Sequence, residues 1–156
     1  MRALCWHGHG DIRCDTVTDP KIVDSRDAII RVTSCAICGS DLHLMGGFVP
    51  TMHKGDVLGH ETMGEVVEVG SGAAHKLKIG DRVVVPFTIS CGNAGYAEGV
   101  YMHAMSGAIR PVKNGRKLSV TRRLVSLDTR ILTEASPGGQ AQYLRVPYAD
   151  VGPITG

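Results

Sequence analysis

The stretch "GHETMGEVVEVG", residues 59–70, decides the fold. From Gly64 to Gly70 apolar and polar residues alternate between two glycines, which is typical of a strand with one buried face. Just before this strand, His60 and Glu61 stand in a glycine-flanked turn. The stretch therefore predicts a β element together with side chains at its start that are able to bind a metal.

Similar segments recur along the chain with turn residues between them. We expect strands in 1–7 (MRALCWH), 28–34 (AIIRVTS), 80–87 (GDRVVVPF) and 141–147 (AQYLRVP). One stretch, "GSDLHLM" at 39–45, predicts a short helical turn with Ser40 or Asp41 as its N-cap. Dense strands without long crossover helices predict an all-β fold, a small antiparallel barrel or sandwich.

Length and composition favour one domain over 1–156. A chain of 156 residues, 43% of them hydrophobic, buries one core, and 20 glycines with 4% aromatic residues favour turn-rich β structure. No window approaches the roughly 20 apolar residues of a membrane span, so we expect a cytoplasmic protein with no membrane partner. Five cysteines without an export signal indicate thiols or metal ligands rather than disulfides.

The net charge of +2 is unevenly distributed, because basic residues are concentrated in residues 110–130. Seven basic residues fall in this window against a single acidic residue, Asp128. No aromatic residues are interleaved with them and no RNA-binding motif is present, so we expect no nucleic-acid partner and interpret the window as a solvated or misfitting segment. The basic residues are Arg110, Lys113, Arg116, Lys117, Arg122, Arg123 and Arg130.

Two cysteines, Cys35 and Cys38, stand in a C-x-x-C arrangement. A redox pair of this kind normally opens a helix in a βαβ unit, and the sequence around it predicts none. A closed structural zinc site needs four ligands, usually in two close pairs, and no second pair follows at a suitable spacing. The remaining option is an open zinc site, in which one thiolate, one imidazole and one carboxylate leave room for a substrate oxygen.

Three motifs carry a resemblance to a known family. They are "CAICGSDLH" (35–43), "GHETMGEVVEVGSG" (59–72) and "KIGDRVVVPFTISCG" (78–92). In this order and spacing they resemble the catalytic domain of zinc-dependent medium-chain alcohol dehydrogenases, and most closely the branch that includes formaldehyde-dehydrogenase-like enzymes. The resemblance runs through 1–92 and resumes over 137–152. It implies a GroES-like barrel with short helical turns.

The resemblance also implies a set of metal ligands. Cys38 would be the thiolate ligand of a catalytic zinc and His60 the imidazole ligand, so their side chains should converge within roughly 4 Å. Glu61 would be a carboxylate able to approach the metal. Asp41 would lie behind His60, accept a hydrogen bond from it and fix its tautomer.

Two further roles follow from the same resemblance. Ser40 would hydrogen-bond the substrate hydroxyl, although capping a helical turn also suits it, and His43 would pass the proton towards solvent. Zinc would act as a Lewis acid while hydride leaves a small alcohol for NAD or NADP, or returns to an aldehyde. Family-like association into homo-oligomers is a further implication.

Two departures from the family limit these expectations. The chain has no G-x-G-x-x-G after a strand, so we expect no nucleotide-binding domain and no cofactor-binding residues in it, and hence no activity of this chain by itself. Family members carry four cysteines around a structural zinc from the position of Cys91 onward. Here no cysteine follows Cys91, which would be a remnant of that site.

For 93–136 we predict translation out of frame relative to the ancestral gene, with the original frame returning at Pro137. One base restored before Asn93 lets the codons around Ala94, Ala97 and Ala104 yield TGC, and the regrouped reading "QCWLCRRGLYACYERSNP" resembles the missing zinc lobe. A natural replacement of the lobe is the alternative. Sequencing the gene decides between them: shifted codons that give neither TGC nor TGT at these three alanines exclude the frameshift.

Three functions remain open on these residues. The first is the catalytic half of a zinc-dependent alcohol or aldehyde dehydrogenase. The second is a non-enzymatic zinc-binding or partner-binding module on the same barrel. The third, a co-chaperonin-like ring subunit, is disfavoured because such a subunit has no need of four residues together: Cys38, Asp41, His43 and His60.

Overall fold

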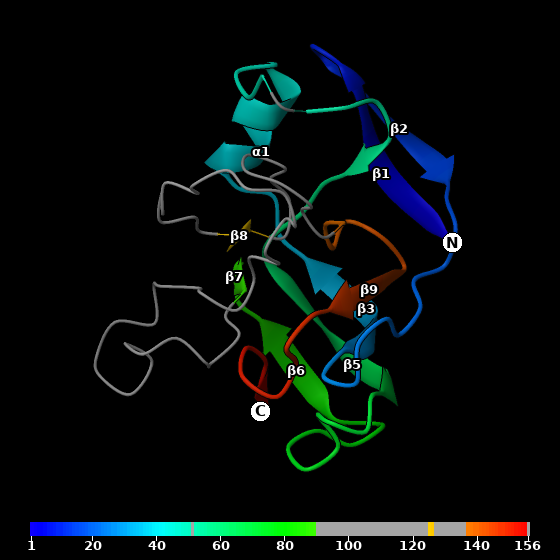
Figure 1. The fold of residues 1–156 in the computed structure, drawn as a ribbon. Helices are drawn as coiled ribbons and strands as arrows, with labels where there is room; N and C mark the ends of the chain where they lie inside the picture. The colour runs from blue at the N-terminus through cyan, green and yellow to red at the C-terminus, as the bar shows by residue number, and fades with distance from the viewer. Residues whose placement is uncertain (51, 90–124, 127–136, 156) are drawn as a thin grey trace, which may run out of the picture.

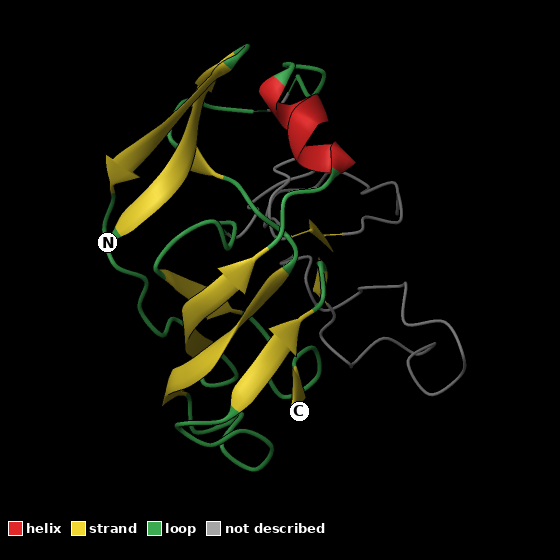
Figure 2. Ribbon diagram, turned by 180° about the vertical axis from the view of Figure 1, so that it is seen from behind, coloured by secondary structure: helices red, strands yellow, loops and turns green. Residues whose placement is uncertain are grey.

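Strands make up nearly all of the regular structure in the computed structural model, which describes residues 1–50, 52–89, 125–126 and 137–155. The single described helix, α1 (Gly39–Met45), lies at one end of the molecule beside a small sheet (Figure 1). The all-β prediction is confirmed, and the predicted helical turn at 39–45 is this helix. Figure 2 shows the same arrangement from behind.

The strands form three antiparallel sheets in the described part of the chain. The three-stranded sheet has the order β2 (Asp11–Thr16), β1 (Arg2–Gly8), β4 (Asp56–Val57). The five-stranded sheet has the order β10 (Ile154–Thr155), β6 (Arg82–Val85), β5 (Thr62–Val69), β3 (Ala28–Cys35), β9 (Tyr143–Val146). The third pairs β7 (Thr88–Ile89) with β8 (Val125–Ser126).

Strand β5 lies at the centre of the larger sheet, between β6 and β3. Its buried residues Thr62, Gly64 and Val66 alternate with more exposed ones, as expected for a strand with one face on the core. The strand begins at Thr62, two residues before the predicted start at Gly64, because Thr62 already pairs with Cys35 on β3 and with Val85 on β6.

The main hydrophobic core covers one face of this sheet. Ile30 and Val66 are completely buried in it, on the paired strands β3 and β5. Loop residues close the core from outside the sheet, and removing this much apolar surface from water is the main force that holds the strands together. The cluster consists of Ala28, Ile30, Val66, Ala73, Leu77, Val83, Val85, Ile89, Leu144, Val146 and Ala149.

The segment just before β9 connects the two larger sheets. Ala141 forms an isolated antiparallel bridge with Ala3 of β1. The Leu4 amide donates to the Gln140 carbonyl at 2.8 Å, and the Gln142 amide donates to the Arg2 carbonyl at 3.1 Å. This segment thus runs beside β1 before it enters the five-stranded sheet.

Most of the segment proposed to be out of frame, 93–136, lies outside the described residues, and so does Cys91. The predicted domain division and the structural-zinc remnant therefore stay predictions. Within the residues that are described, no helix has the length and apolar character needed to cross a membrane.

Candidate metal centre

The helix α1 begins directly after Cys38, which is its N-cap. The Cys38 sulfur accepts a hydrogen bond from the Ser40 amide at 3.4 Å, and Asp41 Oδ2 accepts one from the Cys38 amide at 2.8 Å. The prediction of Ser40 or Asp41 as N-cap was wrong, because the Asp41 carboxylate reaches back to Cys38 and closes a capping box that begins two or three residues earlier. This box fixes the thiol at the start of the helix.

His60 follows a turn that only glycine adopts without strain. Gly59 has φ +102°, and a Cβ at this position would lie 2.5 Å from the Gln140 amide nitrogen. The turn places His60 at the entrance to β5 with only 8% of its surface exposed. The imidazole is thereby held at the same end of the sheet as α1.

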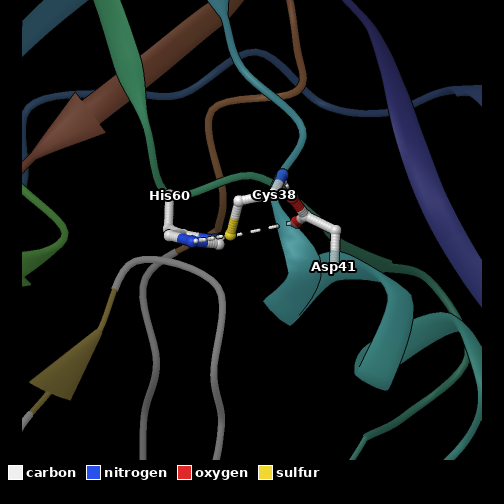
Figure 3. A group of neighbouring side chains, drawn as sticks. All are labelled: Cys38, Asp41 and His60. Atoms are coloured by element: carbon white, nitrogen blue, oxygen red, sulfur yellow. Dashed lines mark hydrogen bonds and ion pairs between the residues drawn. The ribbon is translucent and has the colours of Figure 1, made fainter.

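The structure brings three of the predicted site residues together (Figure 3). Cys38 Sγ lies 3.0 Å from His60 Nε2, within the predicted 4 Å. Asp41 Oδ1 lies 3.7 Å from Nδ1, the other nitrogen of the same ring. Thiol and carboxylate thus approach the same side of the His60 ring, each next to a different nitrogen (Figure 3).

The chemistry of this group fits a zinc ion. Sulfur and nitrogen ligands of a tetrahedral zinc are about 3.5 Å apart, given bond lengths of about 2.3 and 2.0 Å, and Cys38 and His60 are close to that separation. Asp41 Oδ1 is buried and has no hydrogen-bond partner among the described residues. Ligand atoms of all three residues lie within 4.8 Å of one another, and no other such group occurs in the described part of the chain.

The two cysteines of the C-x-x-C pair have different ionisation properties. The pKa of the Cys38 thiol is lowered, chiefly because Ser40 donates hydrogen bonds to the sulfur from its side chain and its main chain, with a smaller contribution from His60. Burial raises the pKa of the Cys35 thiol. Since metals bind the thiolate, Cys38 is the better ligand of the two at neutral pH.

The other predicted residues lie around this group. Ser40 and His43 are exposed on α1, and the His43 ring packs edge-on against Phe48 with 5.7 Å between ring centroids. Glu61 is exposed and does not belong to the group of three, although it lines the same hollow as His60. The ligand role of Glu61 and the relay roles of Ser40 and His43 remain predictions.

A hollow of about 410 Å³ opens beside His60. Its apolar wall comes from the end of β6 and the residues that follow, and Phe87 remains 54% exposed there. Sequence reasoning missed this wall, although Pro86 and Phe87 directly after a valine strand were a signal for it. The apolar side chains that line the hollow include Met63, Val84, Val85, Pro86 and Phe87.

Replacing Asp41 with asparagine is expected to weaken zinc binding about 10- to 100-fold. The carboxylate next to Nδ1 orients the imidazole ring and raises the basicity of the ring. Asparagine has no charge, so the variant loses both effects. Zinc titration against a chromophoric chelator measures the change. Asp11→Asn, on the exposed hairpin strand β2, is the matched control and should bind zinc like the wild type; equal binding by Asp41→Asn would contradict this role.

An all-β fold with a thiol, an imidazole and a carboxylate gathered between the start of α1 and the start of β5 defines the class: a GroES-like domain of the alcohol dehydrogenase type. The family model described as "Alcohol dehydrogenase GroES-like domain" matches residues 24–156. The chain belongs to this family.

Curated relatives agree with this assignment. The chain is 43% identical over 150 residues to the uncharacterized zinc-type alcohol dehydrogenase-like protein AdhB of Bacillus subtilis, an alignment that covers 96% of the chain and 37% of the relative. It is 35% identical over 155 residues to a glutathione-independent formaldehyde dehydrogenase of Pseudomonas aeruginosa, covering 96% of the chain and 36% of that enzyme. The predicted similarity to the formaldehyde dehydrogenase branch is confirmed.

A solved structure supports the fold over its full described length. Alcohol dehydrogenase TADH from Thermus sp. ATN1 superposes with a TM-score of 0.79 at 33% identity, covering 99% of this chain and 40% of that one. The chain thus spans two fifths or less of the length of the proteins that it matches here.

Proposed function

We propose that Cys38 and His60 hold the catalytic zinc of a nicotinamide-linked alcohol or aldehyde dehydrogenase, of which these 156 residues form the metal-binding part. The observation that carries the proposal is the 3.0 Å approach of Cys38 Sγ to His60 Nε2, beside an apolar hollow. When bound, zinc supplies Lewis-acid stabilisation of a substrate alkoxide. A small alcohol or aldehyde has the size and polarity for such a hollow.

Other residues of this chain orient the imidazole, move the proton and bind the hydrocarbon part of the substrate. The negative charge of Asp41, 3.7 Å from Nδ1, favours the tautomer with the proton on Nδ1, which leaves the lone pair of Nε2 for the metal on the side where Cys38 Sγ lies. The Ser40 hydroxyl accepts a hydrogen bond from the substrate hydroxyl and relays the proton by releasing its own, and the exposed His43 passes it on to water. The apolar wall around Phe87 receives the hydrocarbon part of the substrate.

The 156-residue chain by itself is expected not to reduce NAD or NADP with alcohols, even when loaded with zinc. Orientation of the cofactor supplies much of the rate of hydride transfer, and no cofactor-binding motif is apparent in this sequence. Nicotinamide absorbance with a panel of small primary alcohols measures it. Turnover that disappears in Cys38→Ala would contradict this expectation.

A chimera tests the function itself. Residues 1–89 replace the corresponding part of the Pseudomonas aeruginosa formaldehyde dehydrogenase, which supplies the rest of the polypeptide. We expect formaldehyde-dependent NAD reduction in the chimera and its loss in the Cys38→Ala chimera. A folded, zinc-loaded chimera without activity would instead favour the non-enzymatic zinc-binding module.

A further inference from the structure

We propose that the segment Gly138–Gln140 positions His60 in the metal centre, acting through the main chain around Gly59. The inference rests on the proposed function, since it concerns the geometry of the same ligand. None of these residues is near His60 in sequence, and none offers a side chain to the metal group.

Three main-chain hydrogen bonds hold the residues just before His60. The Gly138 amide donates to the Val57 carbonyl at 3.0 Å. The Gln140 amide donates to the Leu58 carbonyl and the Gly139 amide donates to the Gly59 carbonyl, both at 2.8 Å. Each of the three residues that precede His60 is thus fixed by this one segment.

The residue after His60 is fixed from the opposite side. The Ala36 amide donates to the Glu61 carbonyl at 2.9 Å, and Cys35 pairs with Thr62 in the β3–β5 ladder. Cys38 follows Ala36 by two residues. The separation between the thiol and the imidazole is therefore set by two main-chain contacts, one from Ala36 and one from Gly139.

Close packing leaves no room for a side chain where Gly139 contacts the main chain before His60. A Cβ on Gly139 would lie 1.9 Å from Thr62 Oγ1, and a Cβ on Gly138 would lie 2.2 Å from the Leu58 carbonyl oxygen. Thr62 cannot give way easily, because it is only 2% exposed and its hydroxyl lies 3.6 Å from Cys35 Sγ. A methyl group at 139 must therefore shift either Thr62, two residues after His60, or the Gly139 main chain, whose amide holds the Gly59 carbonyl.

Displacing a metal ligand is costly even when the ligand itself is intact. A binding site loses its function when its side chains are held about 1 Å less precisely. Removing a group that orients a metal ligand typically lowers the metal affinity about 10- to 100-fold. Gly139→Ala should therefore weaken metal binding by a factor in this range while Cys38, Asp41 and His60 stay unchanged.

Cobalt(II) is the probe, because its visible absorption reports the geometry of a zinc site. Gly139→Ala is compared with Gly152→Ala, in which the added methyl group meets nothing within 4 Å. We expect about 10- to 100-fold weaker cobalt binding and an altered visible spectrum in Gly139→Ala, with wild-type behaviour in Gly152→Ala. A folded Gly139→Ala with wild-type affinity and spectrum overturns the positioning role.

A second measurement needs no variant to fold. Metal binding stabilises the contacts that hold its ligands, so cobalt should slow hydrogen exchange of the Gly139 and Ala36 amides in the wild-type chain. It should not slow exchange of the Val17 amide, which donates to the Met1 carbonyl away from the site. Unchanged exchange at Gly139 overturns the inference. A wild-type chain that binds no cobalt overturns the proposed function, whereas normal wild-type binding with an unaffected Gly139→Ala overturns only the role of this segment.

Discussion

Cys38→Ala is expected to lower zinc affinity by more than about 100-fold, because even residues that only orient a ligand are worth about 10- to 100-fold. The Cys38 sulfur is the donor atom that lies nearest to His60 Nε2, at 3.0 Å, and its loss leaves only the imidazole and the Asp41 carboxylate in the group. Metal analysis after dialysis, followed by competition with a chromophoric chelator, measures the change.

Cys35→Ala is the matched control for this variant. Cys35 belongs to the same C-x-x-C pair, but its sulfur lies against Thr62 and is not in the metal group. We expect the zinc stoichiometry of Cys35→Ala to equal that of the wild type. Equal loss in both variants would favour a site that uses the two cysteines together, and full zinc binding by Cys38→Ala would remove Cys38 as a ligand.

The second large effect concerns the fold. Ile30→Ala is expected to lower the free energy of unfolding by about 2–5 kcal/mol, because Ile30 is completely buried at the centre of the main core and its truncation leaves a cavity. Urea unfolding followed by far-ultraviolet circular dichroism measures the difference.

Ile79→Ala removes the same atoms from a side chain that is 70% exposed. We expect this control to stay within about 0.5 kcal/mol of the wild type. Similar stabilities of Ile30→Ala and Ile79→Ala would mean that the face of β3 and β5 described above is not the core of the protein.

The long strands were predictable because they carry a strong local signal. In β5 the alternation of the sequence agrees with the position of the core, and in β3 the β-branched residues mark the strand although Ala28, Ile29 and Ile30 are all buried. Strands β4, β7 and β10 are two residues long each and carry no such pattern. They exist because a neighbouring strand supplies their hydrogen bonds, which local sequence does not encode.

The candidate site shows a similar division. The identity of Cys38 and His60 could be predicted because motif and spacing specify chemically distinctive side chains. The helix cap at Cys38 could not be predicted from the sequence. Capping preferences favour serine and aspartate and say little about a thiol that accepts hydrogen bonds. The contacts of Gly139 are main-chain contacts, for which a pair of glycines is the only sequence signal.

The segment that positions His60 also bears on the proposed reading frame. The family resemblance resumes at Pro137, and the next three residues are those that hold the turn before His60. A frame that returned only a few residues later would replace Gly138 and Gly139, and with them the support of the metal centre. The frameshift over 93–136 stays a prediction that the gene sequence tests.

Zinc-edge X-ray absorption of the wild-type chain, loaded with one equivalent of zinc, tests the central claim most directly. Ligation by Cys38 and His60 predicts a sulfur neighbour at about 2.3 Å and nitrogen neighbours at about 2.0–2.1 Å, with the sulfur absent in Cys38→Ala. A zinc bound only by oxygen and nitrogen in the wild type, or a sulfur neighbour that survives in Cys38→Ala, would contradict it.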